Sequence, residues 1–184
     1  PYHAIIYVPV PCQEACPVDC IDKDGQGKIV IDFDRCIMCG KCVRACPFSA
    51  VMDRSQMVDV ISRLGKTEMN ALIAPAAAGQ FDAELEQVIA SARAIGFDRV
   101  YEVAAGADEV AEHESREFRE RMGRGDAFMT TSCCYAYTET VRKHIPELGR
   151  FVASTRTPLA VTAANARAEH PEALNVFIGP CIAK

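Results

Sequence analysis

Short, uninterrupted apolar runs recur along the last two thirds of the chain, and each is closed by Pro, Gly or polar residues. Runs of this length with such boundaries are typical of buried strands. The predicted strands are residues 71–74, 99–104, 127–131 and 175–178.

Between these runs, apolar residues recur at spacings of three and four, which predicts helices. In residues 82–95, for example, Leu85, Val88 and Ala92 fall on one face, and Gly96 is a typical helix stop. The other predicted helices are residues 107–122, 134–144 and 158–169. Strands and helices that alternate at this pitch predict an α/β domain with a mainly parallel sheet and helices on both faces.

Pro75, Cys133 and Cys181 each lie just beyond a predicted strand. Because ligands collect at the carboxyl ends of parallel strands, we expect these three residues to converge on one site. Taken alone, the adjacent pair Cys133 and Cys134 would mean little, since buried cysteine is common in protein cores.

Cysteines dominate the first part of the chain. Seven of the ten lie between Cys12 and Cys46, and residues 47–132 contain none. This division predicts a small cysteine-rich module over residues 1–52 and a larger domain over residues 53–184.

The composition favours a soluble globular protein over a nucleic-acid or membrane protein. The 184 residues carry a formal net charge of −5, whereas nucleic acids and anionic membranes attract basic surfaces. There is no apolar run of about eighteen residues, and the N-terminus shows neither a basic region nor a cleavage site. We therefore expect a cytoplasmic protein whose cysteines bind metal rather than form disulfides.

The strongest signal is a four-cysteine run spaced two, two and three residues apart and followed by Pro: Cys36, Cys39, Cys42 and Cys46. Three closely spaced thiolates on one loop can hold three corners of a 4Fe–4S cluster, while the fourth cysteine turns toward another cluster. A zinc site needs only two CxxC pairs and no trailing CxxxCP, so the spacing favours the cluster.

An incomplete copy of this pattern, Cys12-x3-Cys16-Pro17, precedes it. By pseudo-twofold logic, Cys16 completes the cluster held by Cys36, Cys39 and Cys42. Cys12 and Cys46 would then share a second cluster that lacks ligands. Either further cysteines lie upstream of residue 1 or Cys20 supplies a ligand, but we favour Cys20 as a free buried thiol. The polar residues 22–34 between the half-motifs predict a hairpin.

Residues 9–52 resemble bacterial-type ferredoxins that hold two 4Fe–4S clusters. Beyond them, three short motifs each follow a predicted strand: Ala74-Pro75, Thr131-Ser132-Cys133-Cys134 and Gly179-Pro180-Cys181-Ile182-Ala183-Lys184. In this order the motifs resemble the iron-only (FeFe) hydrogenases, which carry TSCCP, PCxAK and a third, glycine-rich cysteine motif. The resemblance implies an α+β ferredoxin-like iron–sulfur module followed by an α/β domain that holds part of the catalytic H-cluster, a 4Fe–4S unit joined to a diiron unit.

The resemblance also implies roles for individual residues. Cys134 and Cys181 match two of the four ligands of the 4Fe–4S part of the H-cluster. Cys133 matches the thiol that passes protons to the diiron part.

Three further residues match positions around the diiron unit of the family. Lys184 matches the lysine that pairs with one cyanide, and the Ala74–Pro75 turn matches the segment that packs against the other. The resemblance therefore implies a cofactor-binding role for all three residues.

Glu114, Glu117 and Arg121 match the proton-relay positions of the family. Their spacing places them on one helical face, which supports this assignment independently. The alternative is an ordinary solvated charged face, and the charged residues around them keep that alternative open.

Several positions depart from the family pattern. Tyr135 stands where most members have Pro, Gly179 where Met is common, and Ala76 where Ser is frequent. Ala153 stands where a relay serine is expected, although Ser154 is adjacent. The third cysteine motif is not within residues 1–184, so we expect the N-terminal portion of a divergent member.

The expected function is reversible reduction of protons to dihydrogen, with electrons exchanged with a soluble partner such as a ferredoxin. Nucleic acid and membrane partners are not expected. Two alternatives remain: a ferredoxin-like electron-transfer protein with a structural second domain, and a non-hydrogenase relative that assembles iron–sulfur proteins. Such relatives usually keep one cysteine at the TSCC position, so the Cys133–Cys134 pair favours the hydrogenase.

Overall fold

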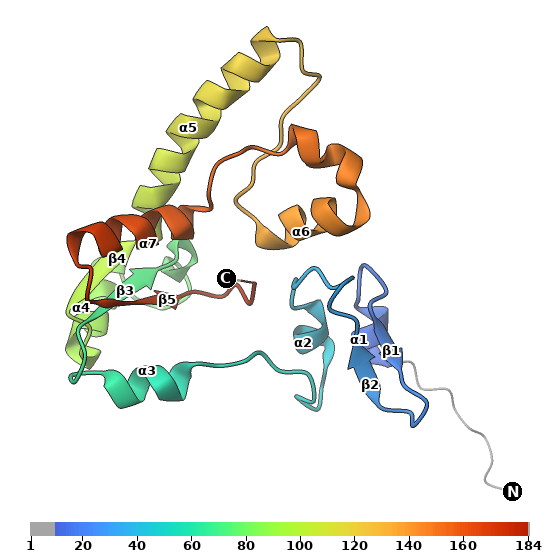
Figure 1. Ribbon diagram of the computed structural model, residues 1–184. Helices are drawn as coiled ribbons and strands as arrows, with labels where there is room; N and C mark the ends of the chain where they lie inside the picture. Colours follow the sequence, from blue (N-terminus) through green and yellow to red (C-terminus); the bar gives the residue numbers. More distant parts are fainter. Residues whose placement is uncertain (1–9, 184) are drawn as a thin grey trace, which may run out of the picture.

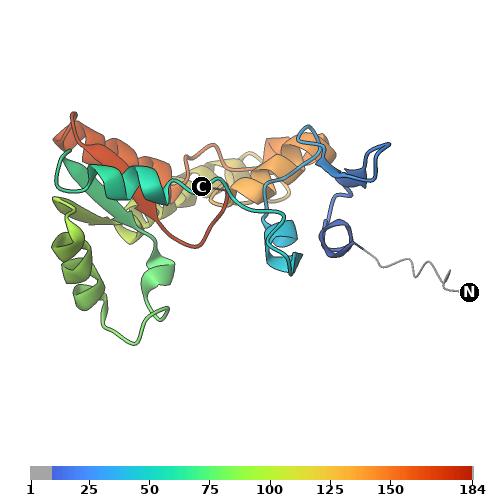
Figure 2. The same cartoon turned by 90° about the horizontal axis from the view of Figure 1, so that it is seen from below.

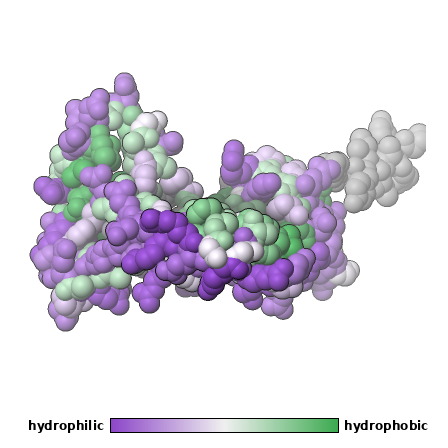
Figure 3. Space-filling model, turned by 90° about the horizontal axis from the view of Figure 1, so that it is seen from above, coloured by the Kyte–Doolittle hydropathy of each residue, from purple (hydrophilic) through white to green (hydrophobic). Residues whose placement is uncertain are grey.

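The computed structural model describes residues 10–183. The chain forms two parts, a small cysteine-rich module and a larger α/β part, with α6 (Tyr135–His144) beside the module (Figures 1 and 2). Seen from above, the visible face is mostly hydrophilic and is interrupted by apolar patches (Figure 3). Within the described residues, no helix is both long and apolar enough to cross a membrane.

The module consists of two short helices and a hairpin. The helices α1 (Pro11–Glu14) and α2 (Lys41–Ala45) contact each other, and β1 (Ile21–Lys23) pairs antiparallel with β2 (Ile29–Ile31). The Asp24 carboxylate accepts two backbone N–H groups in the turn, which closes the hairpin that the polar residues predicted.

The α/β part is built on a parallel sheet. Among the described residues it has three strands in the order β4-β3-β5, with β3 (Met69–Ile73) in the centre. The neighbours β4 (Arg99–Glu102) and β5 (Leu174–Ile178) pair parallel with β3 on either side. Every residue of β3 is buried, which explains its continuous apolar run.

Helices cover both faces of this sheet, as the alternation of patterns predicted. On one face, α3 (Met57–Arg63) and α4 (Leu85–Ile95) contribute Val60 and Ala92 to a core around Met69 and Ile73, and Leu64, directly after α3, packs against the same core. The other face carries α5 (Val103–Gly123) and α7 (Pro158–Glu169), whose Val103 and Ala166 pack with Leu72.

The packing of α5 against α7 depends on Gly106. A Cβ at this position would lie 2.2 Å from Thr162 Oγ1 and 2.6 Å from the Pro158 carbonyl oxygen. Only glycine permits this close approach of the two helices. Because Gly106 is helical, α5 starts at Val103 and not at residue 107, and β4 ends at Glu102.

The predicted strand at residues 127–131 is wrong. Thr130 and Val152 form an isolated parallel bridge that lies outside the sheet. The Phe128 ring instead stacks on the Phe151 ring with centroids 4.2 Å apart. The apolar run is therefore explained by packing against η2 (Pro146–Phe151), which a local pattern does not distinguish from strand burial.

Candidate functional site

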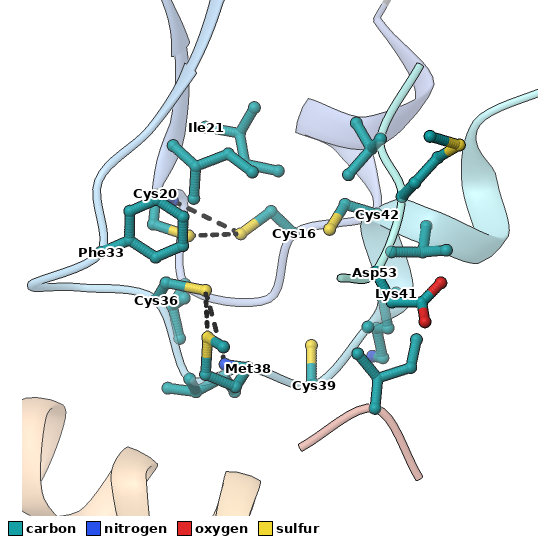
Figure 4. A pocket seen from close by; sticks show the side chains of 18 of the residues that line it. Cys16, Cys20, Ile21, Phe33, Cys36, Met38, Cys39, Lys41, Cys42 and Asp53 are labelled. Atoms are coloured by element: carbon teal, nitrogen blue, oxygen red, sulfur yellow. Dashed lines mark hydrogen bonds between the residues drawn. The ribbon is translucent and has the colours of Figure 1, made fainter. Parts of the chain in front are cut away.

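A cavity of about 500 Å³ opens in the cysteine module and reaches the α/β part. Its wall includes the four cysteines that the spacing predicted for one cluster: Cys16, Cys36, Cys39 and Cys42. Figure 4 shows their sulfur atoms arranged around a common space. Two segments far apart in the sequence therefore contribute thiols to one site.

The backbone around these cysteines is shaped for a cluster. Gly40 caps α2 at φ 75° and Met38 lies at φ 59°, so the loop turns tightly around the cavity. The Met38 and Cys20 N–H groups donate to Cys36 Sγ and Cys16 Sγ, each at 3.4 Å. N–H groups directed at sulfur stabilise the negative charge of ligating thiolates, so the donor set fits a 4Fe–4S cluster.

Cys20 is buried beside Cys16, with the two sulfur atoms 3.4 Å apart. Burial, and then the hydrogen bond with Cys16 and the nearby Cys36 thiol, raise the pKa of Cys20 to about 12. Burial also raises the pKa of Cys42, an expected ligand, and Cys20 lines the same cavity, so this shift does not separate a free thiol from a ligand. The role of Cys20 as a free buried thiol stays a prediction.

Cys12 and Cys46, expected in a second cluster, do not line this cavity. Cys12 is buried in the module core. Cys46 Sγ accepts the Ala50 N–H at 3.3 Å, and N–H groups of Val51, Phe48 and Ala50 lower the pKa of Cys46. Among residues 10–183, no three Cys, His, Asp or Glu side chains converge on a single metal ion. The second cluster stays a prediction.

The segment after β5 contacts residues 33–40, which carry Cys36 and Cys39 and are called the cluster loop. Cys181 and Ile182 line the same cavity as the module cysteines. A Cβ on Gly40 would lie 2.6 Å from Ile182 Cδ1, so the loop and the segment are in direct contact.

The Ala74–Pro75 turn lies next to this segment. The Ala74 N–H donates to the Ile178 carbonyl at 2.9 Å, and Pro75 begins the 3₁₀ helix η1 (Pro75–Ala77). A Cβ on Gly179 would lie 2.8 Å from Ala74 Cβ and 2.5 Å from the Phe177 ring. The structure thus makes the carboxyl ends of β3 and β5, which precede Pro75 and Cys181, neighbours, and it explains why Gly replaces a larger residue at position 179. Cys133 does not follow a strand of the sheet, so the convergence of all three residues on one site stays a prediction.

Cys133 and Cys134 lie just before α6, and both are exposed. Cys134 is the N-cap residue, whereas Cys133 Sγ lies 3.6 Å from Thr131 Oγ1. Figures 1 and 2 both place the start of α6 near the C-terminal segment. Neither cysteine lines the cavity that Cys181 borders, so joint ligation by Cys134 and Cys181 stays a prediction.

The carboxylate of Glu114 contacts the residue that precedes the pair Cys133–Cys134. Its Oε1 accepts the Ser132 N–H at 3.3 Å and the Thr155 hydroxyl at 2.8 Å. The Ser132 hydroxyl donates to the Thr155 carbonyl at 2.6 Å. Glu114 is therefore connected to the residue that precedes Cys133.

Glu117 and Arg121, further along α5, form a second group of hydrogen-bonded residues. Arg121 donates to Glu117 Oε1 at 2.5 Å and to the Val152 carbonyl at 3.0 Å. The Ser154 hydroxyl donates to Glu117 Oε2 at 3.0 Å. Partial burial raises the pKa of Glu117, but the Ser154 N–H and Arg121 outweigh it and hold this pKa below its ordinary value.

Ser154, and not position 153, supplies the hydroxyl next to Glu117. Ala153 is buried, so its methyl group points into the protein. Although Ala153 departs from the family pattern, a hydroxyl group therefore still lies next to Glu117. Lys184 lies outside the described residues.

Sequence reasoning missed two contributors to the site. Thr155 contacts both Glu114 and Ser132, and its only local signal is its position after Ser154. Lys143 reaches the cluster loop from α6, and its signal is the basic run Arg142-Lys143-His144 at the helix end.

Together, the cysteine-lined cavity and the parallel α/β part define an iron–sulfur redox protein. Residues 67–184 match the family described as iron only hydrogenase large subunit, C-terminal domain, and residues 29–52 match the 4Fe-4S binding domain. The chain belongs to the family of iron-only hydrogenase large subunits, and its module binds a 4Fe–4S cluster. The resemblance found in the sequence motifs is confirmed.

Curated relatives include two hydrogenases. The chain is 25% identical over 175 residues to the NADP-reducing hydrogenase subunit HndD of Solidesulfovibrio fructosivorans, covering 81% of this chain and 30% of that protein. It is 27% identical over 158 residues to iron hydrogenase 1 of Clostridium pasteurianum, covering 75% and 28%. The chain thus spans less than a third of either hydrogenase.

Solved structures of FeFe-hydrogenases share the fold. One, from a study of stepwise H-cluster assembly in HydA(deltaEFG), has a TM-score of 0.58 at 23% identity, covering 67% of this chain and 37% of that one. Another, from a study of oxygen inactivation through the 2Fe subcluster, has a TM-score of 0.56 at 22% identity, covering 67% and 38%. The predicted fold class, a ferredoxin-like module followed by an α/β part, is confirmed.

Proposed function

We propose that this chain is part of an FeFe hydrogenase that reversibly reduces protons to dihydrogen. Residues 1–52 form its electron-carrying module, and residues 53–184 form the first part of the domain that holds the H-cluster. One observation carries the proposal: two groups of hydrogen-bonded carboxylates and hydroxyls lie on α5, Glu117 with Ser154 and Glu114 with Thr155, and Glu114 also contacts the residue before Cys133. A protein that only transfers electrons needs no such polar groups.

The electron side of the reaction rests on the cavity of the module. Cys16, Cys36, Cys39 and Cys42 would hold the 4Fe–4S cluster, and Cys181 borders the same cavity. A cluster there would lie next to the segment that carries a predicted H-cluster ligand. A soluble donor or acceptor such as a ferredoxin would exchange electrons with the module, and a cytoplasmic location fits this role.

The proton side rests on α5. Arg121 holds Glu117, Glu117 contacts Ser154, and Glu114 contacts the peptide N–H of Ser132. Protons would pass along these groups to the thiol of Cys133, which is exposed beside them.

The bound H-cluster would supply the two-electron chemistry on protons and dihydrogen. Cys134 and Cys181 would hold its 4Fe–4S part, while Ala74, Pro75 and Lys184 would contact its diiron part. Position 179 accommodates only glycine at the carboxyl ends of β3 and β5, because a side chain there would collide with Ala74 and Phe177.

The complete protein that contains this chain tests the proposal. After anaerobic maturation, hydrogen evolution with a reduced dye as electron source should be readily measurable. Glu114→Gln should lower it about a hundredfold, within the range expected for a general acid–base group. Glu112→Gln, on the same helix but exposed, is the matched control and should retain the parent rate. A matured protein with full iron content and no hydrogen turnover would contradict the proposal.

A further inference from the structure

Two residues at the C-terminal end of α6 contact three backbone carbonyls of the cluster loop. Lys143 Nζ donates to the Cys36 carbonyl at 2.6 Å and to the Phe33 carbonyl at 3.0 Å. His144 Nε2 lies 2.8 Å from the Arg35 carbonyl oxygen. More than a hundred positions separate each pair in the sequence, so these contacts join the two parts of the molecule.

The ammonium group of Lys143 is held in place and largely shielded from water. Only 11% of its side chain is exposed, and Glu139 Oε2 lies 3.0 Å away on the preceding turn. Hydrogen bonds from Arg142, aided by Lys143, lower the pKa of Glu139 to about 2, so this carboxylate is ionised at neutral pH. Glu139, Arg142 and Lys143 together carry one net positive charge.

The position of this charge matters because Cys36 is one of the cluster cysteines. One-electron reduction adds a negative charge to the cluster. A cation that is shielded from water and hydrogen-bonded to the carbonyl of a ligating cysteine stabilises this reduced form. The effect raises the reduction potential of that cluster.

The same helix begins at Cys134, the predicted ligand of the next cluster. Ten residues at about 1.5 Å per residue make α6 about 15 Å long. One rigid element therefore runs from the cysteine pair to the loop of the module cluster.

We propose that Lys143 is a positioning residue that fastens the module to α6 and raises the reduction potential of the cluster held by Cys36. Through this contact the catalytic part of the chain sets the potential of the cluster that serves it. The inference rests on the 4Fe–4S site of the proposed function, but it does not require hydrogen turnover.

The test measures the midpoint potential of the module cluster by EPR-monitored redox titration of the anaerobically reconstituted chain. Lys143→Met should lower the potential by about 59 mV, which is a tenfold change in the one-electron equilibrium. Lys143→Arg should keep most of the parent value. Lys66→Met removes an exposed lysine whose ammonium donates to the Ser62 carbonyl of its own segment, and it should leave the potential unchanged.

Glu139→Gln provides a second arm with the opposite sign. Loss of the carboxylate leaves the Lys143 charge uncompensated, so the potential should rise. A merely structural role would not move the two variants in opposite directions. The inference is overturned if Lys143→Met and Glu139→Gln both keep the parent potential or both shift it downward. Failure of the parent chain to bind any 4Fe–4S cluster would instead overturn the proposed function.

Discussion

The hydroxyl of Ser154 donates a hydrogen bond to the Glu117 carboxylate across 37 positions of the sequence. The contact ties the loop before α7 to the middle of α5. The Ser154 N–H also donates to both oxygens of the same carboxylate, at 3.2 and 3.1 Å. The backbone would thus hold Glu117 in place even without the hydroxyl, so a substitution can separate proton transfer from structure.

Ser154→Ala should therefore slow hydrogen turnover in the complete, matured protein while leaving its fold and iron content intact. We expect a loss of about tenfold to a hundredfold, because one hydroxyl of the proton path is removed. Hydrogen evolution measured with electrons in excess checks this.

Adding Ala153→Ser to Ser154→Ala serves as a control for position. Ala153 is buried, so a hydroxyl there cannot replace the one at position 154, and the double variant should remain slow. Full turnover in Ser154→Ala would show that protons do not use this hydroxyl.

A second prediction separates the ligands of the module cluster from its neighbouring thiol. Cys39→Ser should remove or convert the EPR signal of the reduced cluster after anaerobic reconstitution, because a ligand is lost. Cys20→Ser should keep the signal and the iron content, because we expect Cys20 to be a buried free thiol beside Cys16 and not a ligand. Loss of iron in Cys20→Ser would identify Cys20 as a ligand, and zinc in place of the cluster would contradict the site altogether.

The sequence predicted those features of the fold and the site that depend on the spacing of nearby residues. The cysteine spacing predicted four of the thiols that line one cavity, while Cys20 and Cys181 line it as well. The apolar periods predicted the three sheet strands and α4, α5 and α7, but not α3. The strand at residues 127–131 was wrong: the Phe128 ring stacks on a distant aromatic ring, Phe151. The start of α5 was placed four residues late because Val103 and Ala104 were assigned to the preceding strand, whereas Gly106 lies within the helix and packs against Thr162.

Contacts between distant segments could not be predicted in the same way. The basic run at the end of α6 marks Lys143 but does not indicate that it reaches the Cys36 carbonyl, since that contact depends on how α6 lies against the module. The same holds for Thr155 and Glu114, which are 41 positions apart. Spacing on one helix placed Glu114, Glu117 and Arg121 on a common face, but the hydroxyls that contact the two carboxylates come from the loop before α7.

A third prediction concerns stability. Gly106→Ala should destabilise the chain by about 1–3 kcal/mol, because the added methyl group would collide with the Pro158 carbonyl and the Thr162 hydroxyl. Urea unfolding under anaerobic conditions, at equal cluster content, checks this value. Gly123→Ala is the matched control in the same helix, where an added Cβ meets nothing within 4 Å. It should be neutral or slightly stabilising, and equal effects of the two substitutions would rule out the steric explanation.

The final prediction separates Cys133 from Cys134. Cys134 caps α6, whereas Cys133 lies one residue earlier, next to Ser132, whose N–H contacts Glu114. A proton carrier must change its protonation state during turnover, whereas a cluster ligand must stay a thiolate. In the complete, matured protein, Cys133→Ser should keep nearly all the iron and lower hydrogen evolution by at least about a hundredfold.

Cys133→Asp should restore part of this activity, because a carboxylate can also carry protons at that reach. Cys134→Ala should instead lose or destabilise the cluster itself, since a ligand is missing. Iron analysis and hydrogen evolution, measured on the same preparations, distinguish the two outcomes. The assignment is reversed if Cys133→Ser loses iron while Cys134→Ala keeps it. It fails if Cys133→Ser turns over at the parent rate, because then the polar groups on α5 would not deliver protons through this thiol.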